Sequence, residues 1–335
     1  DDLQSRYGKD ILARDQRQFI ADKLEERDER HRRAGESRYL VEPDVKDGKG
    51  GMRDLHTLFW IAKFVYGTRS VRELYKSGLF TRKEQNRFIK CEDFLWAVRC
   101  HLHFMTGRGD DRLGFDRQAE MAARLGYEGH AGLRSVERFM KHYFLVAKDV
   151  GDLTRIMSAV LEAQHIKQAP SMSELFGRFR RRSIKLDDDG VFTIEAGRIK
   201  AVDEDLFVRD PVSIIRLFRV AEHNNLSIHP TTLRLVRRSR RAIDKQMRAD
   251  PAANELFLDI LTRSRDPEAV LRKMSEAGVL GRFILEFGRI TALMQFNMYH
   301  HYTVDEHLLR AVGILSKIDQ GVLKQDHPLA SGIIQ

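Results

Sequence analysis

The sequence predicts a mainly α protein, a multi-helix bundle with short β elements. Apolar residues recur every three or four positions over long stretches, the spacing that places them on one face of a helix. Several of these stretches stop at a glycine, and aspartate followed by proline begins others. Together these observations predict a helical core that is interrupted near residues 38–46 and near residues 190–202.

Three long helices are predicted in the first half of the chain. The apolar positions of each share one face, as in the core helices of a bundle. The first two end at a glycine, which tolerates the left-handed backbone that closes many helices. The predicted helices cover the stretch from Leu55 to Gly67, residues 84–106 before Gly107, and the stretch from about Gly132 to Ile166.

Three helix starts are predicted in the second half, where aspartate precedes proline. Aspartate caps the free amides of a helix start, and proline suits the first helical position because no amide partner is needed there. These pairs are Asp210-Pro211, Asp250-Pro251 and Asp266-Pro267.

Two short stretches are predicted to be β structure. Pro43 disfavours helix within residues 38–46 and removes an amide donor, so an edge strand is predicted there. Residues 190–202 contain two apolar runs separated by Ala196-Gly197, which predicts a small hairpin. We expect this hairpin to separate two helical regions.

The composition restricts the classes of function. The 335 residues include 58 lysines and arginines against 49 aspartates and glutamates, and the net charge of +9 favours phosphates or acidic surfaces. Cys91 and Cys100 are too far apart on one helix for a local disulfide, which fits a reducing cytoplasm. No apolar run approaches the roughly 20 residues that span a bilayer. We expect a soluble cytoplasmic protein without a membrane contact, cut from a longer chain because it begins without Met.

A glycine-rich turn over residues 45–54 is a candidate phosphate-binding site. Its glycines let backbone amides converge before a helix whose N-terminus is partly positive, and nearby lysine and arginine add full charges. The turn lacks the Gly-Lys-Ser/Thr of a Walker A loop, and a tight structural connection is the alternative interpretation. The candidate nucleotide- or phosphate-binding residues are Lys46, Gly50, Gly51, Arg53 and Asp54.

A candidate metal ligand lies near the C-terminal end. Thr303 and Glu306 have the spacing of a capping box, which places His307 in the first turn of a helix. Neutral imidazole binds divalent metals, and Asp305 could orient the ring. The alternative is a surface or capping histidine that binds no metal.

Two motifs resemble one enzyme family. Glu42-Pro43-Asp44-Val45-Lys46 followed by Gly50 to Leu55 is similar to the E-P-x-x-K and G-G-x-R-D-L signature of the bifunctional uridylyltransferases that modify the nitrogen-regulatory PII protein. A related signature occurs in the glutamine synthetase adenylyltransferases. Residues 299–308 resemble the start of the HD-type phosphohydrolase domain of the PII-modifying family. Residues 102–118 also resemble that family, although a loop closed by arginine–aspartate pairs, the favoured interpretation, explains them without any substrate.

The resemblance implies a reaction and its cofactors. The enzyme would transfer UMP from UTP to a tyrosine of PII with Mg²⁺, and would remove it hydrolytically at a divalent metal such as Mn²⁺ or Mg²⁺ bound in part by His307. The Asp-x-Asp carboxylates of the transferase are expected before residue 1, and glutamine would act through regions after Gln335. Asp203-Glu204-Asp205 has a similar spacing, but its context predicts a turn before a helix. The chain by itself is therefore expected to be inactive.

The resemblance also implies a domain map. The four predicted segments are the end of the nucleotidyltransferase domain (1–66), a helical bundle (67–186), a hairpin with a helical connector (187–290) and the start of an HD domain (291–335).

Two other functions are compatible with the residues. Residues 210–219 and 230–232 resemble the helical neck of CCA-adding and poly(A) polymerases, and a helical docking module without catalysis is the second alternative. Two arginine-rich patches would suit RNA, but no aromatic residues interleave with them, so solvated helix faces are favoured and nucleic acid is not expected as a partner. The patches are Arg178, Arg180, Arg181, Arg182 and Lys185, and the stripe Arg234, Arg238, Arg241, Lys245 and Arg248.

Overall fold

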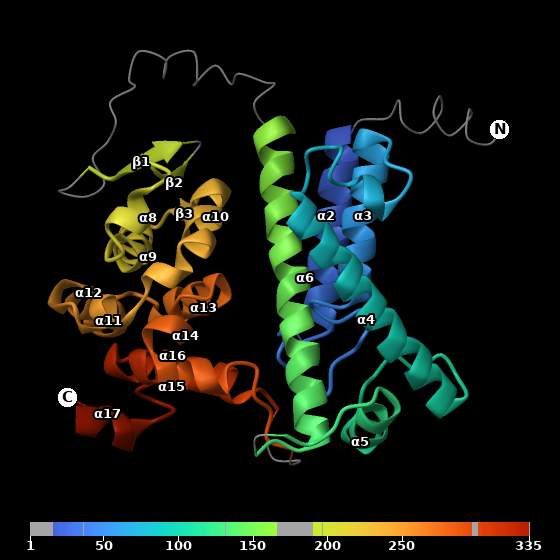
Figure 1. Cartoon of the computed structure of the whole chain (residues 1–335). Helices are drawn as coiled ribbons and strands as arrows, with labels where there is room; N and C mark the ends of the chain where they lie inside the picture. Colours follow the sequence, from blue (N-terminus) through green and yellow to red (C-terminus); the bar gives the residue numbers. More distant parts are fainter. Residues whose placement is uncertain are drawn as a thin grey trace. The chain divides into compact units, whose positions relative to one another are not determined.

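The computed structural model describes residues 16–35, 37–130, 132–165, 190–195, 197–296 and 301–334 (Figure 1). The chain divides into two compact units, which are described separately. Unit 1 is Asp1–Ala169 with Ala292–Thr303, and unit 2 is Pro170–Thr291 with Val304–Gln335. Helices dominate both units, so the predicted mainly α class is confirmed.

Unit 1 is a helical bundle built around one long helix. Helix α6 packs against α3, α4 and α5, and α2 packs against α3 (Figure 1). Its core is one apolar cluster that includes Leu55, Phe88, Leu95, Phe139 and Phe144, all buried. The elements are α2 (Gln16–Arg33), α3 (Met52–Tyr66), the 3-10 helix η2 (Val71–Glu73), α4 (Arg82–Thr106), α5 (Phe115–Arg124) and α6 (Ser135–His165).

The predicted helix ends in unit 1 are confirmed where glycine follows the helix. Gly67 after α3 and Gly107 after α4 both have left-handed backbones, with φ of 65° and 63°. The start of α4 is fixed by a capping box in which Thr81 and Glu84 exchange hydrogen bonds with each other's backbone amides. The sequence analysis did not identify this box.

The predicted edge strand at residues 38–46 is wrong. The segment makes only isolated bridges, between Leu40 and Tyr302 and between Asp44 and Arg112. Pro43 cannot donate to a ladder, and the Asp44 carboxylate accepts the amides of Lys46 and Asp47, which turns the chain at once. The backbone therefore bends before a strand can form.

Unit 2 contains a small three-stranded sheet. Strands β1 (Phe192–Glu195) and β2 (Arg198–Ala201) pair antiparallel with Phe192 opposite Ala201, which confirms the predicted hairpin. Strand β3 (Ser227–Ile228) adds to β2 in parallel. The sequence analysis did not predict β3, because a strand of two residues carries no alternation pattern.

Helices form the rest of unit 2. They surround a second apolar core that includes Phe207, Leu217, Phe218, Ile260 and Met274. The elements are α8 (Leu206–Arg209), α9 (Ser213–His223), α10 (Pro230–Arg238), the 3-10 helix η4 (Arg240–Ala242), α11 (Lys245–Ala249), α12 (Pro251–Arg263), α13 (Pro267–Ala277), α14 (Leu280–Phe283), α15 (Leu285–Ile290), α16 (Val304–Asp319) and α17 (Pro328–Ile334).

Two of the three proline-led helix starts are confirmed. Asp250 accepts the amides of Ala252 and Ala253 at the start of α12, and Asp266 accepts the amide of Ala269 in α13. The third was placed too early, because α9 begins at Ser213 after a turn over Pro211 and Val212. Asp210 contributes there through its carboxylate, which accepts the Ser213 hydroxyl.

The predicted arginine stripe is not one helix face. Helix α10 ends at Arg238, and η4 and α11 follow as separate elements, so residues 234–248 change direction. Asp244 caps α11 by accepting the amide of Met247, which starts a new helix within the proposed stripe. The other patch, residues 178–185, lies outside the described residues.

The structure divides the chain into two units, whereas four segments were predicted. The predicted boundaries stay predictions. Residues of segment 1–66 and of segment 67–186 up to Leu161 share the core of unit 1. Within segment 291–335, residues 292–303 belong to unit 1, and α16 packs against α13 in unit 2. Within the described ranges, no helix combines the length and the apolar character that crossing a membrane requires.

Candidate functional site

The glycine-rich turn is closely packed against its surroundings. A Cβ atom on Gly50 would lie 2.6 Å from the Ala147 carbonyl oxygen, and one on Gly51 would lie 2.8 Å from the Val45 carbonyl oxygen. Gly50 also has a φ of +83°, which other residues rarely adopt. Both glycines are therefore required by the path of the backbone.

The backbone amides of the turn already donate within the chain. Gly50 donates to the Asp54 carboxylate at 2.9 Å, and Gly51 donates to the Gly48 carbonyl at 2.9 Å. The amides of Met52, Arg53 and Asp54 donate to the carbonyls of Val45, Lys46 and Gly51, respectively. A phosphate at this turn would consequently be held by side chains and not by these amides.

Asp54 locks the turn to α2. Its carboxylate is 2% exposed and lies 2.6 Å from Arg30 Nη2 and 2.9 Å from His31 Nε2. Burial alone would raise the pKa of Asp54, but the hydrogen bond and charge of His31, the Gly50 amide and the charge of Arg30 outweigh it and lower the pKa. Asp54 is thus a buried carboxylate that stays ionised and joins two helices.

Lys46 and Arg53 keep partly exposed charged groups. Their side chains are 32% and 30% exposed. Lys46 Nζ lies 3.9 Å from carboxylate oxygens of both Asp47 and Asp111, and Arg53 Nε lies 3.4 Å from Asp47. Arg53 also lies over the Trp60 ring, 5.8 Å from its centre. These contacts are long, so both cations can turn to an added anion.

A pocket lies between α2 and the glycine-rich turn. Its volume is about 550 Å³, within the range of small-molecule sites. Arg53 and Asp44 both line it. Burial and the negative charges of Asp47 and Asp111 raise the pKa of Asp44. The lining residues are Glu26, Glu29, Arg30, Arg33, Ala34, Asp44, Asp47 and Arg53.

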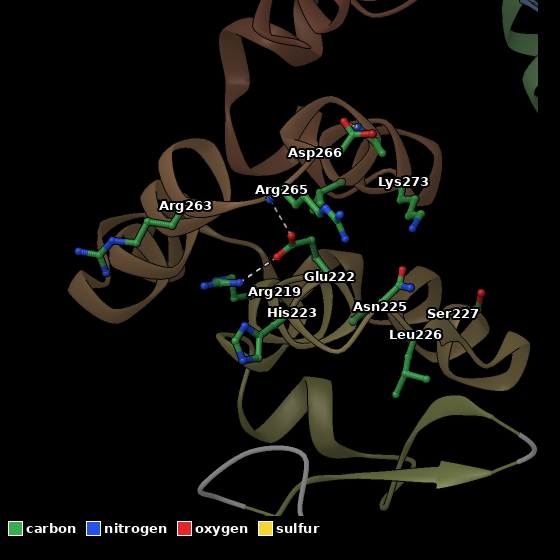
Figure 2. Close-up of a pocket in the computed structure, with 13 residues that line it drawn as sticks. Arg219, Glu222, His223, Asn225, Leu226, Ser227, Arg263, Arg265, Asp266 and Lys273 are labelled. Carbon is green, nitrogen blue, oxygen red and sulfur yellow. Dashed lines mark hydrogen bonds and ion pairs between the residues drawn. The ribbon is translucent and has the colours of Figure 1, made fainter. Parts of the chain in front are cut away.

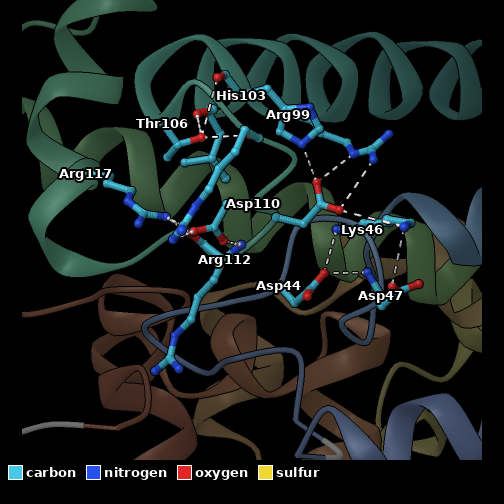
Figure 3. Close-up of polar contacts among 12 residues, drawn as sticks. Asp44, Lys46, Asp47, Arg99, His103, Thr106, Asp110, Arg112 and Arg117 are labelled. Carbon is cyan, nitrogen blue, oxygen red and sulfur yellow. Dashed lines mark hydrogen bonds and ion pairs between the residues drawn. The ribbon is translucent and has the colours of Figure 1, made fainter.

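A second polar cluster, centred on Asp111, supports the other side of the turn, and Figure 3 shows Lys46, Arg99 and His103 of this cluster. Arg99 Nε and His103 Nε2, both on α4, lie 2.7 Å and 2.8 Å from the Asp111 carboxylate. Burial raises the pKa of Asp111, but the hydrogen bonds of Arg99 and His103 outweigh it and lower the pKa. The Asp111 carbonyl accepts the Val45 amide at 2.9 Å. The cluster therefore fixes the backbone that leads into Lys46.

The first half of the signature motif serves the fold. The Glu42 carboxylate accepts the amide of Phe115, the first residue of α5, and pairs with Arg112 at 3.0 Å. The hydrogen bond from Phe115 is the main reason that the pKa of Glu42 is lowered. Nearby, Asp110 pairs with Arg117 (Figure 3) and also with Arg108. A loop closed by arginine–carboxylate pairs, the alternative interpretation of residues 102–118, describes this region.

The partners of the buried Asp54 and the partly buried Asp111 were not predicted from the sequence. Arg30 and His31 precede Asp54 by more than 20 residues, and Arg99 and His103 lie on a helix before Asp111. Only the α4 pair could have been recognised in the sequence, because Arg99 and His103 are four residues apart and therefore share one face of a helix. No local pattern in α2 indicated that Arg30 and His31 pair with Asp54.

His307 lies in the first turn of α16, as predicted, and its side chain is exposed. The predicted capping box is wrong, because Glu306 pairs with Arg272 and Arg310 and the buried Thr303 hydroxyl has no hydrogen-bond partner among the described residues. In the parts of the chain that the structure describes, no three histidine, cysteine, aspartate or glutamate side chains gather as a metal site. The role of His307 as a metal ligand stays a prediction.

Comparison with known families agrees with this arrangement. Residues 18–158 match the model of the GlnD PII-uridylyltransferase family, and residues 192–283 match the model of the uridylyltransferase GlnD third domain. No solved structure matches the chain. The two matches together cover more than half of the sequence, and they favour neither an RNA nucleotidyltransferase nor a docking module without catalysis. The chain is therefore a member of the GlnD PII-uridylyltransferase family, and its function is that of a PII uridylyltransferase.

Proposed function

We propose that Lys46 and Arg53 bind the phosphates of UTP during transfer of UMP to PII. The observation that carries this proposal is the division within the signature motif. Gly50, Gly51 and Asp54 are committed to the fold, whereas the two cations are partly exposed and only loosely paired. Phosphate oxygens form strong hydrogen bonds with such cations.

The charge around the two cations supports a phosphate held together with a metal ion. Asp47 lies near both, and Glu26, Glu29 and Asp44 line the adjoining pocket. A bare triphosphate would be repelled by these carboxylates, whereas Mg²⁺ bound to the triphosphate would offset the repulsion. Mg²⁺ would supply charge stabilisation for the transferred phosphoryl group. Lys46 and Arg53 would orient the remaining phosphate oxygens.

Alanine at Lys46 or at Arg53 is expected to raise the KM for UTP. Loss of a charge-assisted hydrogen bond costs about 1.5–3 kcal/mol, so we expect an increase of roughly tenfold or more. The measurement is uridylylation of PII by the full-length enzyme at varied UTP concentration. Lys90→Ala and Arg82→Ala, which remove exposed cations from α4, are the matched controls. Equal KM values in all four variants would contradict the proposal.

We propose further that residues 1–335 catalyse neither reaction alone. Among the residues that the structure describes, no Asp-x-Asp pair lies on a strand, and Asp203 and Asp205 lie in a turn before α8. The transferase carboxylates would come from residues before Asp1. Incubation of the chain with PII, UTP and Mg²⁺, and separately with uridylylated PII and Mn²⁺, should yield no product. Turnover above an empty preparation in either assay would refute this.

We also propose that the enzyme removes the uridylyl group, with His307 as one metal ligand of an HD-type phosphohydrolase. The support is the position of this exposed histidine at the start of α16 and the similarity of residues 299–308 to that domain. A divalent ion such as Mn²⁺ or Mg²⁺ would lower the pKa of a bound water. Glutamine control would act through other regions, and the free thiols of Cys91 and Cys100 are consistent with a reducing cytoplasm.

A further inference from the structure

A second pocket, in unit 2, is lined mainly by cationic and polar side chains (Figure 2). Its volume is about 520 Å³, within the size range of small-molecule sites. It lies where the end of α9 and the start of β3 meet the junction between α12 and α13. The lining residues are Arg219, Ala221, Glu222, His223, Asn225, Leu226, Ser227, Arg263, Arg265, Asp266, Ala269, Val270 and Lys273.

Both carboxylates of this pocket are already engaged. One oxygen of Glu222 accepts the backbone amide of Arg265 at 2.8 Å, and the other accepts Arg219 Nη1 at 2.9 Å. Asp266 is the cap of α13 and accepts the amide of Ala269 at 3.0 Å. Glu222 is thus paired with Arg219, and among the described residues Asp266 forms no ion pair with Arg265 or Lys273.

Two cations remain without a counter-ion. Across the described ranges of the chain, the side chains of Arg265 and Lys273 have no hydrogen-bond or ion-pair partner. Figure 2 shows both charged ends pointing toward the gap above Asn225, whereas Arg263 extends away from this group and pairs with Asp259 at 3.0 Å. The pocket thus carries four cationic side chains against two carboxylates, with the excess charge on one side.

The opposite side of the gap offers neutral hydrogen-bond donors. Asn225 has a left-handed backbone, with φ of 50°, which lets the chain turn sharply from α9 into β3. This turn places the Asn225 amide and the Ser227 hydroxyl in the pocket lining, and His223 lies one turn earlier. Asn225 and Ser227 are both exposed.

We propose that this pocket binds a phosphate-bearing small molecule no larger than a mononucleotide. Arg265 and Lys273 would contact its phosphate oxygens, and Asn225 and Ser227 would donate hydrogen bonds to the rest of it. A guanidinium and an ammonium group that converge without counter-ions suit an anion with several oxygens. The limited volume favours a small molecule over a nucleic acid strand, which needs an extended groove with stacking aromatics.

The test is calorimetric titration of the 335-residue chain with orthophosphate, pyrophosphate and UMP at low ionic strength. Pyrophosphate is expected to bind more tightly than orthophosphate, because it can contact Arg265 and Lys273 together. Stronger binding of UMP than of orthophosphate would identify a nucleotide as the ligand, and equal binding would identify phosphate itself. Loss of one charged contact, in Arg265→Ala or Lys273→Ala, should weaken binding about tenfold or more.

Three controls make the result decisive. Lys317→Ala removes an exposed cation of α16 outside the pocket and should leave binding unchanged. A Lys46→Ala/Arg53→Ala background removes the proposed UTP contacts in unit 1, so binding that persists in this background belongs to the unit 2 pocket, and failure of one proposal is distinguishable from failure of the other. Circular dichroism confirms that each variant folds.

Absence of binding by all three ligands, or unchanged binding in Arg265→Ala/Lys273→Ala, would overturn the proposal. A short single-stranded RNA that binds through the same two residues more tightly than UMP would overturn the assignment to a small molecule.

Discussion

Asparagine in place of Asp54 is expected to destabilise unit 1 by about 3 kcal/mol at neutral pH. The substitution leaves Arg30 and His31 with no buried carboxylate, and breaking one side of a buried ion pair typically costs this amount. It also weakens the hydrogen bond that holds the Gly50 amide. Both tryptophans, Trp60 and Trp96, lie in unit 1, so urea unfolding followed by tryptophan fluorescence reports on this unit.

The pH dependence gives the same prediction an independent test. The lowered pKa of Asp54 means that its stabilisation is fully present above the unfolded-state pKa of about 3.9. It is lost as the pH falls below that value toward the folded pKa. The stability difference between the wild type and Asp54→Asn should therefore shrink below about pH 4.

Glu29→Gln is the matched control for Asp54→Asn. Glu29 lies on α2 and pairs with Arg33, but both side chains are exposed, so we expect an effect below about 1 kcal/mol. If the two variants unfold at the same urea concentration, Asp54 does not lock the turn.

Alanine in place of His307 is expected to abolish uridylyl removal and spare transfer in the full-length enzyme. Loss of one ligand weakens metal binding by about tenfold or more and leaves the bound water less acidic. The measurement is release of UMP from uridylylated PII, with transfer from UTP assayed in parallel. Since His307 is exposed in the first turn of α16, the substitution should not disturb folding.

His327→Ala is a suitable control because His327 is also an exposed histidine of unit 2, located before α17. It should leave both reactions unchanged. Normal removal by a folded His307→Ala protein would show that His307 is a surface histidine and not a metal ligand.

Local patterns in the sequence predicted several of the helices, including α3, α4, α6, α12 and α13. Glycine ends α3 and α4 because only its left-handed backbone closes these helices without strain, and that requirement is visible in the sequence. The hairpin of β1 and β2 was visible for a similar reason, because Gly197 has a φ of 71° at its turn.

Long-range contacts decided the features that the sequence did not predict. The T-x-x-E spacing occurs at Thr81 and at Thr303, but only the first forms a capping box. The second fails because Arg272, 34 residues before Glu306, takes the carboxylate. Spacing alone cannot distinguish two sites that differ in a distant arginine.

The candidate site shows the same limit. Its residues were identified from the glycine-rich turn, with support from a family resemblance, but their separate tasks depend on α2, which was not predicted. Asp54 is buried only because Arg30 and His31 compensate its charge. Because α2 was not predicted, no sequence pattern distinguished the structural role of Asp54 from the phosphate-binding role proposed for Lys46 and Arg53.

The KM for UTP in Arg53→Ala and Asp54→Asn, compared at a temperature where both proteins are folded, tests the central claim most directly. We propose that Arg53 binds UTP and that Asp54 stabilises the fold of the glycine-rich turn. We therefore expect a KM raised roughly tenfold or more in Arg53→Ala and a KM close to wild type, with lower stability, in Asp54→Asn. A KM raised equally in both variants, or raised in Asp54→Asn alone, would contradict this division of roles.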